Sequence, residues 1–145
     1  MRATELVLAA IMLLTSGAVF AGQGCMYEHE IANHINTAFD IENGTFTENA
    51  YAILTGALEM VDENLEDVQA DPAHLETIQM IKSNVLYNLA CLEALQNNTE
   101  EAFMWLEKAI DTGFNDREWM ESDADLTGLH EDPRFDGLLM KIGTT

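Results

Sequence analysis

The chain has 145 residues, enough for one domain with its own core, and its formal net charge is −20 because 26 acidic residues oppose six basic ones. This charge repels phosphate groups, so we expect no nucleic-acid partner and no attraction to anionic membrane surfaces. The charge has two explanations: it only keeps the protein soluble, or it forms an acidic docking surface.

Residues 1–21 have the pattern of a secretory signal peptide. An apolar segment over 6–14 is interrupted at 15–17, and Val19-Phe20-Ala21 provides small residues at a cleavage position. The segment is too short for a comfortable membrane span, which needs about 20 apolar residues. We therefore predict an exported protein, periplasmic or secreted, with an uncleaved N-terminal anchor as the alternative.

The N-terminal segment over 22–30 contains Cys25, one of two cysteines. A cysteine just beyond an apolar run is where bacterial lipoproteins are acylated, so a lipoprotein stays open, and a membrane is an expected partner only in that case. A disulfide to Cys91 is not expected. On the predicted helices the two residues are offset by about 20 Å, whereas a disulfide tolerates roughly 4.4–6.8 Å between Cα atoms.

Apolar residues at helical spacing account for the rest of the chain. The predicted helices cover 26–40, 45–70, 73–96, 97–113, 116–121, a short segment that ends at 129, and 132–142. Two of them start with a capping residue and a Glu three positions later, Thr45 with Glu48 and Asn97 with Glu100. No segment alternates as a strand does, so the predicted fold class is all-α.

Two stretches of the chain repeat each other 52 residues apart. The identical pairs are Asn36/Asn88, Ala38/Ala90, Thr47/Thr99, Glu48/Glu100, Ala50/Ala102, Leu54/Leu106 and Ala57/Ala109. Small residues at equivalent positions of two helical hairpins indicate places where helices touch closely. A helix pair cannot bury its apolar face alone, so neighbouring pairs stack into a solenoid, an architecture that usually presents a binding surface.

The segment from Ser83 to Asp116 resembles a tetratricopeptide repeat (TPR). Its large and small positions are occupied by Leu86, Leu89, Ala90, Ala102, Leu106 and Ala109. Glu93 departs from the pattern, which usually has an aromatic residue there. The copy over 31–64 is weaker. Residues 117–142, with Asp-Pro-Arg-Phe at 132–135, look like the cap that follows the last repeat in bacterial TPR proteins.

The resemblance implies a short right-handed superhelix of antiparallel helix hairpins with extended central helices. Its parts would be repeat one at 31–64, a helical extension at 65–82, repeat two at 83–116 and a C-terminal cap at 117–142. It further implies a non-catalytic scaffold in the cell envelope that binds a peptide or protein segment in a groove.

The resemblance also names the expected groove residues, which come from the first helix of each repeat. They are Ile35, Phe39, Tyr87, Cys91 and Ala94. Because these are mostly apolar and the surroundings are acidic, we expect a protein partner with apolar anchors and Lys or Arg flanks. The alternative is that Phe39 and Tyr87 simply pack against the neighbouring segments.

Two other functions stay open. Two repeats are fewer than the three or so that a stable solenoid needs, so a self-associating structural component of the envelope, a homo-oligomer, is one alternative. A metal-binding or enzymatic protein is the other. His29 and His34 lie five residues apart, whereas a zinc-binding helix uses a spacing of four. Cys25 with a histidine lacks a residue to orient the pair. No metal, cofactor or catalytic residue is therefore predicted.

A partial calcium-loop pattern lies near the C-terminus. Asp123, Asp125, Thr127 and Gly128 match it, but Arg134 stands where a bidentate Glu is needed. A cation there would repel the metal, so we interpret these acidic residues as helix caps.

Overall fold

The computed structural model describes residues 24–40, 42–67 and 72–142. In chain order its elements are α2 (Gly24–Asn36), β1 (Phe39–Asp40), β2 (Thr45–Phe46), α3 (Ala50–Asp67), α4 (Pro72–Leu95), α5 (Thr99–Thr112), α6 (Arg117–Ser122), the 3-10 helix η1 (Ala124–Leu129) and α7 (Pro133–Ile142). The predicted all-α fold class is confirmed, since only the two-residue strands are not helical elements. The predicted signal peptide lies outside the described residues, and so does the side chain of Cys25.

A small β-hairpin replaces the end of the predicted first helix. Phe39 pairs with Phe46 and Asp40 with Thr45 in antiparallel register, and the two phenyl ring centres are 5.0 Å apart. The Asp40 carboxylate accepts hydrogen bonds from the backbone and side-chain N–H groups of Asn43, which also hold the pKa of Asp40 below its usual value. The prediction of a helix up to residue 40 is wrong because this local turn competes with the helix.

The two predicted capping boxes are also wrong. Thr45 lies on a strand, and α3 begins only at Ala50. Asn98, not Asn97, is the N-cap of α5, and it makes no side-chain capping hydrogen bond. Its amide donates instead to Glu93 at 2.7 Å.

Of the two predicted caps in the partial calcium-loop pattern, Asp123 is confirmed, whereas Asp125 lies within η1. Asp116 accepts a hydrogen bond from the backbone of Trp119 at the start of α6, and Asp123 accepts one from the backbone of Asp125 at the start of η1. Asp132 does the same for the backbone N–H of Arg134 at the start of α7. Short acidic side chains before a helix satisfy N–H groups that have no partner within the helix, and this explains why the pattern predicted these starts correctly.

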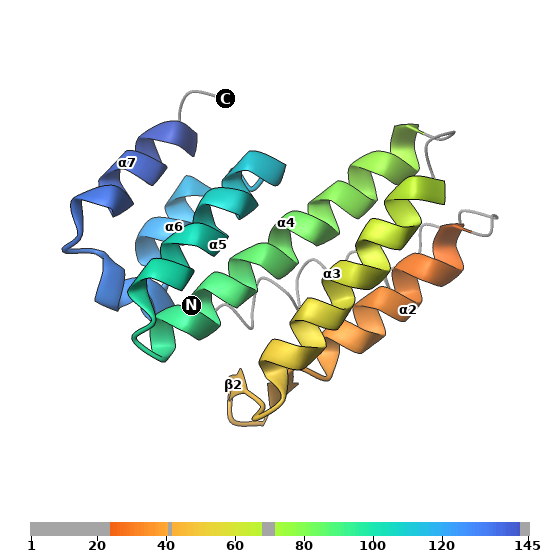
Figure 1. The fold of residues 1–145 in the computed structure, drawn as a ribbon, viewed down its shortest axis with the longest axis horizontal. Helices are drawn as coiled ribbons and strands as arrows, with labels where there is room; N and C mark the ends of the chain where they lie inside the picture. The colour runs from red at the N-terminus through yellow and green to blue at the C-terminus, as the bar shows by residue number, and fades with distance from the viewer. Residues whose placement is uncertain (1–23, 41, 68–71, 143–145) are drawn as a thin grey trace.

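Helix α4 is the central element of the fold. Figure 1 shows α2 and α3 on one side of it and α5, α6 and α7 on the other. From one face of α4, the residues Leu86, Tyr87, Ala90, Cys91 and Ala94 belong to the C-terminal core cluster, which also includes buried residues of α5, α6, η1 and α7. From the other face, Ile78, Ile81, Val85, Leu89 and Leu92 belong to the N-terminal core cluster, which also includes buried residues of α2, β1 and α3. At 3.6 residues per turn the two sets point in roughly opposite directions, about 180° apart, so α4 belongs to both clusters.

The repeated small residues are buried in both copies. Ala90, Ala102 and Ala109 are 0% exposed where α4 meets α5. Ala38, Ala50 and Ala57 are at most 1% exposed in the N-terminal cluster. This burial is consistent with the expectation that the repeated alanines lie where helices touch closely. No helix within the described ranges has both the length and the apolar character to cross a membrane.

Gly113 ends α5 in a conformation that other residues adopt only with strain. Its φ is 119°, and the backbone N–H groups of Gly113 and Phe114 close the helix on Ile110 and Ala109. We expect Gly113→Ala to lower the free energy of unfolding by about 1–2 kcal/mol, measured by urea denaturation. Gly128→Ala is the control, because Gly128 has no positive φ and a Cβ there meets nothing within 4 Å. An equal loss in both variants would contradict the conformational explanation.

Candidate functional site

An open groove of about 490 Å³ lies between α5 and α7. Its lining residues, which define the α5–α7 groove, are Glu100, Phe103, Met104, Glu107, Arg134, Gly137, Leu138 and Lys141. Phe103 and Leu138 are almost fully buried and give the groove an apolar base, while Met104 is 40% exposed. Gly137 adds no side chain, and a Cβ built there meets nothing within 4 Å. The groove thus offers an apolar surface to an incoming side chain.

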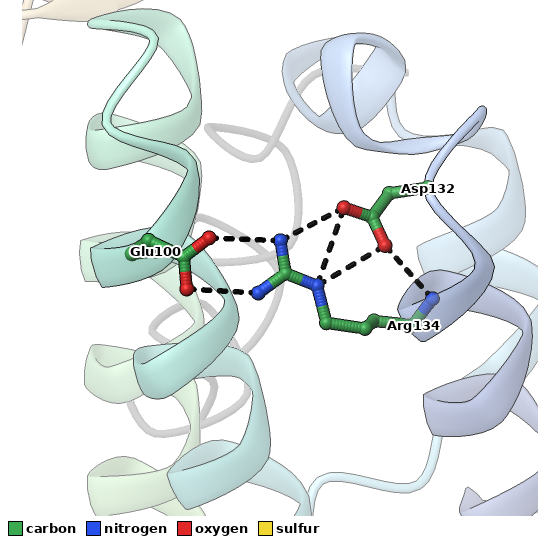
Figure 2. A network of polar contacts seen from close by, with 3 residues as sticks. All are labelled: Glu100, Asp132 and Arg134. Carbon is green, nitrogen blue, oxygen red and sulfur yellow. Dashed lines mark hydrogen bonds and ion pairs between the residues drawn. The ribbon is translucent and has the colours of Figure 1, made fainter.

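Arg134 closes one end of the groove by bridging two carboxylates. Figure 2 shows its guanidinium group between Glu100 and Asp132. Two parallel hydrogen bonds of 2.9 and 3.0 Å join it to Glu100, and one of 2.8 Å joins Nη2 to Asp132. These hydrogen bonds from Arg134 lower the pKa of both carboxyl groups and raise the pKa of the guanidinium. The guanidinium carbon also lies 4.2 Å from the centre of the Phe103 ring.

Lys141 closes the other end. Its Nζ lies 2.5 Å from Asp111 and 3.8 Å from Glu107, and the hydrogen bond with Asp111 raises the pKa of Lys141. The Glu100–Arg134 and Glu107–Lys141 pairs both join residues 34 positions apart. Helix α7 therefore runs beside α5 in the same direction, with an ion pair at each end of the groove.

The cations of the described part of the chain are engaged within the protein. Lys82 pairs with Asp62, Arg117 with Glu121, and Lys108 lies over the ring of Trp105. Arg134 and Lys141 hold α7 against α5 as described above. Since the chain carries 26 acidic residues, its surface field is strongly negative and has few cations of its own to compensate it.

The five residues predicted to line a groove are all buried, at 9% exposure or less. Ile35 and Phe39 belong to the N-terminal core cluster, whereas Tyr87, Cys91 and Ala94 belong to the C-terminal one. The structure thus divides them between two clusters and presents none of them as an open surface. Phe39 is moreover a strand residue, not part of the expected first helix. For Tyr87, Cys91 and Ala94 the physical reason is that α4 is covered on both faces.

Tyr87, Cys91 and Asp123 form a buried polar cluster that joins α4 to η1. The Tyr87 hydroxyl donates to Asp123 Oδ2 at 2.8 Å, and Cys91 Sγ lies 3.7 Å from the same oxygen. The ring of Tyr87 stacks on Phe114 at 4.3 Å. Burial raises the pKa of both the phenol and the thiol, and the nearby Asp123 adds to each increase. A fully buried thiol with a raised pKa is a poor nucleophile, so this cluster serves the fold.

The partial calcium-loop pattern has a different role in the structure. Asp123 is 1% exposed, and its carboxylate accepts hydrogen bonds from the Tyr87 hydroxyl and from the backbone N–H of Asp125 at the N-terminus of η1. Within the ranges that the structure describes, no group of three or more His, Cys, Asp or Glu side chains could hold a metal ion.

Helical periodicity did not identify the α5–α7 groove. Arg134 attracted notice only as part of the Asp-Pro-Arg-Phe run and as the residue that excluded calcium. A usable signal was nevertheless present. The acidic residues at 100 and 107 are each followed by a basic residue one TPR length later, at 134 and 141. Opposite charges at a repeat spacing indicate neighbouring helices with the same direction.

No family model, curated protein or solved structure matches this chain. Its function is therefore inferred from the groove, the buried cluster and the charge distribution. Of these, the groove is the feature that an external molecule can reach.

Proposed function

We propose that this chain is a non-catalytic binding module that takes a basic protein segment into the α5–α7 groove. The observation that carries the proposal is an open groove of about 490 Å³ with an apolar base, set in a chain with a net charge of −20. Apolar burial would hold the segment, and the negative field would attract its positive charge and speed its approach.

The proposal extends to the architecture, a short stack of the TPR type. Three successive helix pairs support it: α2 with α3, α4 with α5, and the α6–η1 segment with α7. The offset of 34 residues between paired side chains of α5 and α7 equals the length of one TPR. On this hypothesis α7 is the second helix of a further, capping pair, and its apolar face closes the end of the stack.

The lining of the groove favours one partner chemistry. Met104 is flexible and polarisable, so it can adapt to apolar anchors of different shape, and Leu138 and Phe103 line the same groove. Glu100 and Glu107 flank this apolar surface and are 78% and 63% exposed as side chains. A segment with one or two large apolar residues between arginines or lysines matches both features. Export to the cell envelope remains part of the proposal on the N-terminal pattern alone.

A direct test is the binding of a short fluorescein-labelled peptide with two leucines flanked by arginines to the full chain, followed by fluorescence anisotropy. We expect saturable binding that weakens as salt rises. In Gly137→Leu the new side chain enters the groove, so we expect affinity to fall about tenfold or more. The same substitution should stabilise the fold by up to about 1 kcal/mol, since glycine is a poor helix former.

Gly128→Leu is the matched control, because Gly128 also faces open space but does not line the groove. It should bind the peptide as the wild type does. A peptide with glutamates in place of the arginines should not bind. Equal binding by Gly137→Leu and wild type would refute the groove as the site. A wild-type mass of two chains in gel filtration that Gly137→Leu reduces to one would favour self-association instead.

A further inference from the structure

Arg134 occupies a position whose surroundings suit a guanidinium group in general. Two carboxylates accept its N–H groups (Figure 2), and the guanidinium carbon lies over the ring of Phe103, 4.2 Å from its centre. Planar bidentate pairing and stacking on a ring are the two contacts by which proteins recognise arginine rather than lysine. The chain thus contains a complete arginine site and fills it with its own arginine.

The occupant is partly exposed to solvent. The side chains of Arg134 and Glu100 are 45% and 78% exposed, and that of Asp132 is 27% exposed. Water and salt screen ion pairs at such positions, and a long side chain gains rotamer freedom when it is released. Rotation of Arg134 into solvent would leave two carboxylates and the face of Phe103 open at one end of the α5–α7 groove.

We propose that Arg134 is an internal competitor, and that an arginine of the bound segment displaces it from the site made by Glu100, Asp132 and Phe103. This inference rests on the proposed function, because the ligand is the same basic segment. A lone arginine gains little binding free energy, since it must replace an equivalent group that is tethered beside the site. A segment that also inserts an apolar side chain beside Met104 gains the additional contact. Arg134 therefore makes the groove selective for arginine next to an apolar anchor.

The test uses N-acetyl-arginine methylamide as the probe and follows the amide resonances of the isotope-labelled full chain by NMR. In Arg134→Gln the site is vacant, so we expect the probe to bind about tenfold more tightly than it binds the wild type. Arg117→Gln is the matched control, because it removes the same charge from a surface arginine that pairs with Glu121 outside the groove. It should leave the affinity for the probe unchanged.

A second variant separates the arginine site from the overall charge. Adding Glu100→Gln to Arg134→Gln removes one wall of the site, so the tenfold gain should disappear. Far-UV circular dichroism should show the same helicity in all variants, since each changed side chain is exposed.

Three results would overturn the inference: no gain in Arg134→Gln, an equal gain in Arg117→Gln, or a gain that survives Glu100→Gln. If one of these occurs while the leucine–arginine peptide still binds wild type and is lost in Gly137→Leu, the proposed function stands without the competitor. If that peptide binds neither wild type nor Arg134→Gln, the proposed function itself fails, whatever the small probe does.

Discussion

Replacement of Leu106 by alanine is expected to lower the free energy of unfolding by about 2–5 kcal/mol, because it deletes a fully buried side chain from the C-terminal core cluster. Leu54, the equivalent residue of the first copy, is also 0% exposed but lies in the N-terminal core cluster. Leu54→Ala should therefore cost a similar amount. Urea denaturation, followed by circular dichroism and by tryptophan fluorescence, measures both losses.

The two variants also test whether the clusters unfold together. Trp119 packs against the C-terminal cluster and Trp105 against both clusters, so the variants are made in a Trp105→Phe background, in which the fluorescence reports on the C-terminal cluster. Since α4 belongs to both clusters, we expect Leu54→Ala to shift the fluorescence transition as far as the dichroism transition. Met104→Ala is the control on α5, where an exposed side chain should cost less than about 1 kcal/mol. A fluorescence transition that Leu54→Ala leaves in place would mean that the two clusters unfold independently.

Stability is expected to fall steeply at alkaline pH because of the buried Tyr87 and Cys91 side chains. The pKa of each is raised in the folded chain, chiefly by burial. The unfolded chain therefore releases these protons first, so the stabilisation is complete below the unfolded pKa and is lost as pH rises toward the folded one. The loss should begin near pH 8.5 for the thiol and near pH 10 for the phenol, at about 1.4 kcal/mol per pH unit for each group.

Variants of the cluster assign these two contributions. Cys91→Ala should delay the onset from about pH 8.5 to about pH 10. Tyr87→Phe should keep the early onset, and at neutral pH it should cost about 1–3 kcal/mol because Oδ2 of the buried Asp123 loses the hydrogen bond from the Tyr87 hydroxyl. Tyr51→Phe, at a tyrosine that is 45% exposed, should change neither quantity. Urea denaturation at a series of pH values measures these effects, and an unchanged profile in Cys91→Ala would disprove the role of the thiol.

Local side-chain chemistry made much of the fold predictable. The helical spacing of Leu54, Leu106 and their neighbours identified buried faces correctly, because a helix must bury its apolar stripe whatever covers it. The C-terminal helix starts at Asp123 and Asp132 followed from a local rule, since a cap needs only its own few residues. Where two local solutions competed, as at Asp40 and Thr45, the pattern did not decide between hairpin and helix.

By itself the sequence determined the fold class, most of the helices, the burial of the repeated alanines and the acidity of the surface. Tertiary structure alone decided that α4 is covered on both faces, which buries Tyr87 and Cys91 instead of exposing them in a groove. It also decided that α7 lies along α5, with Arg134 and Glu100 in contact. The reason is physical: periodicity records which side of a helix is apolar, whereas the identity of its neighbour depends on how all the apolar faces are covered at once.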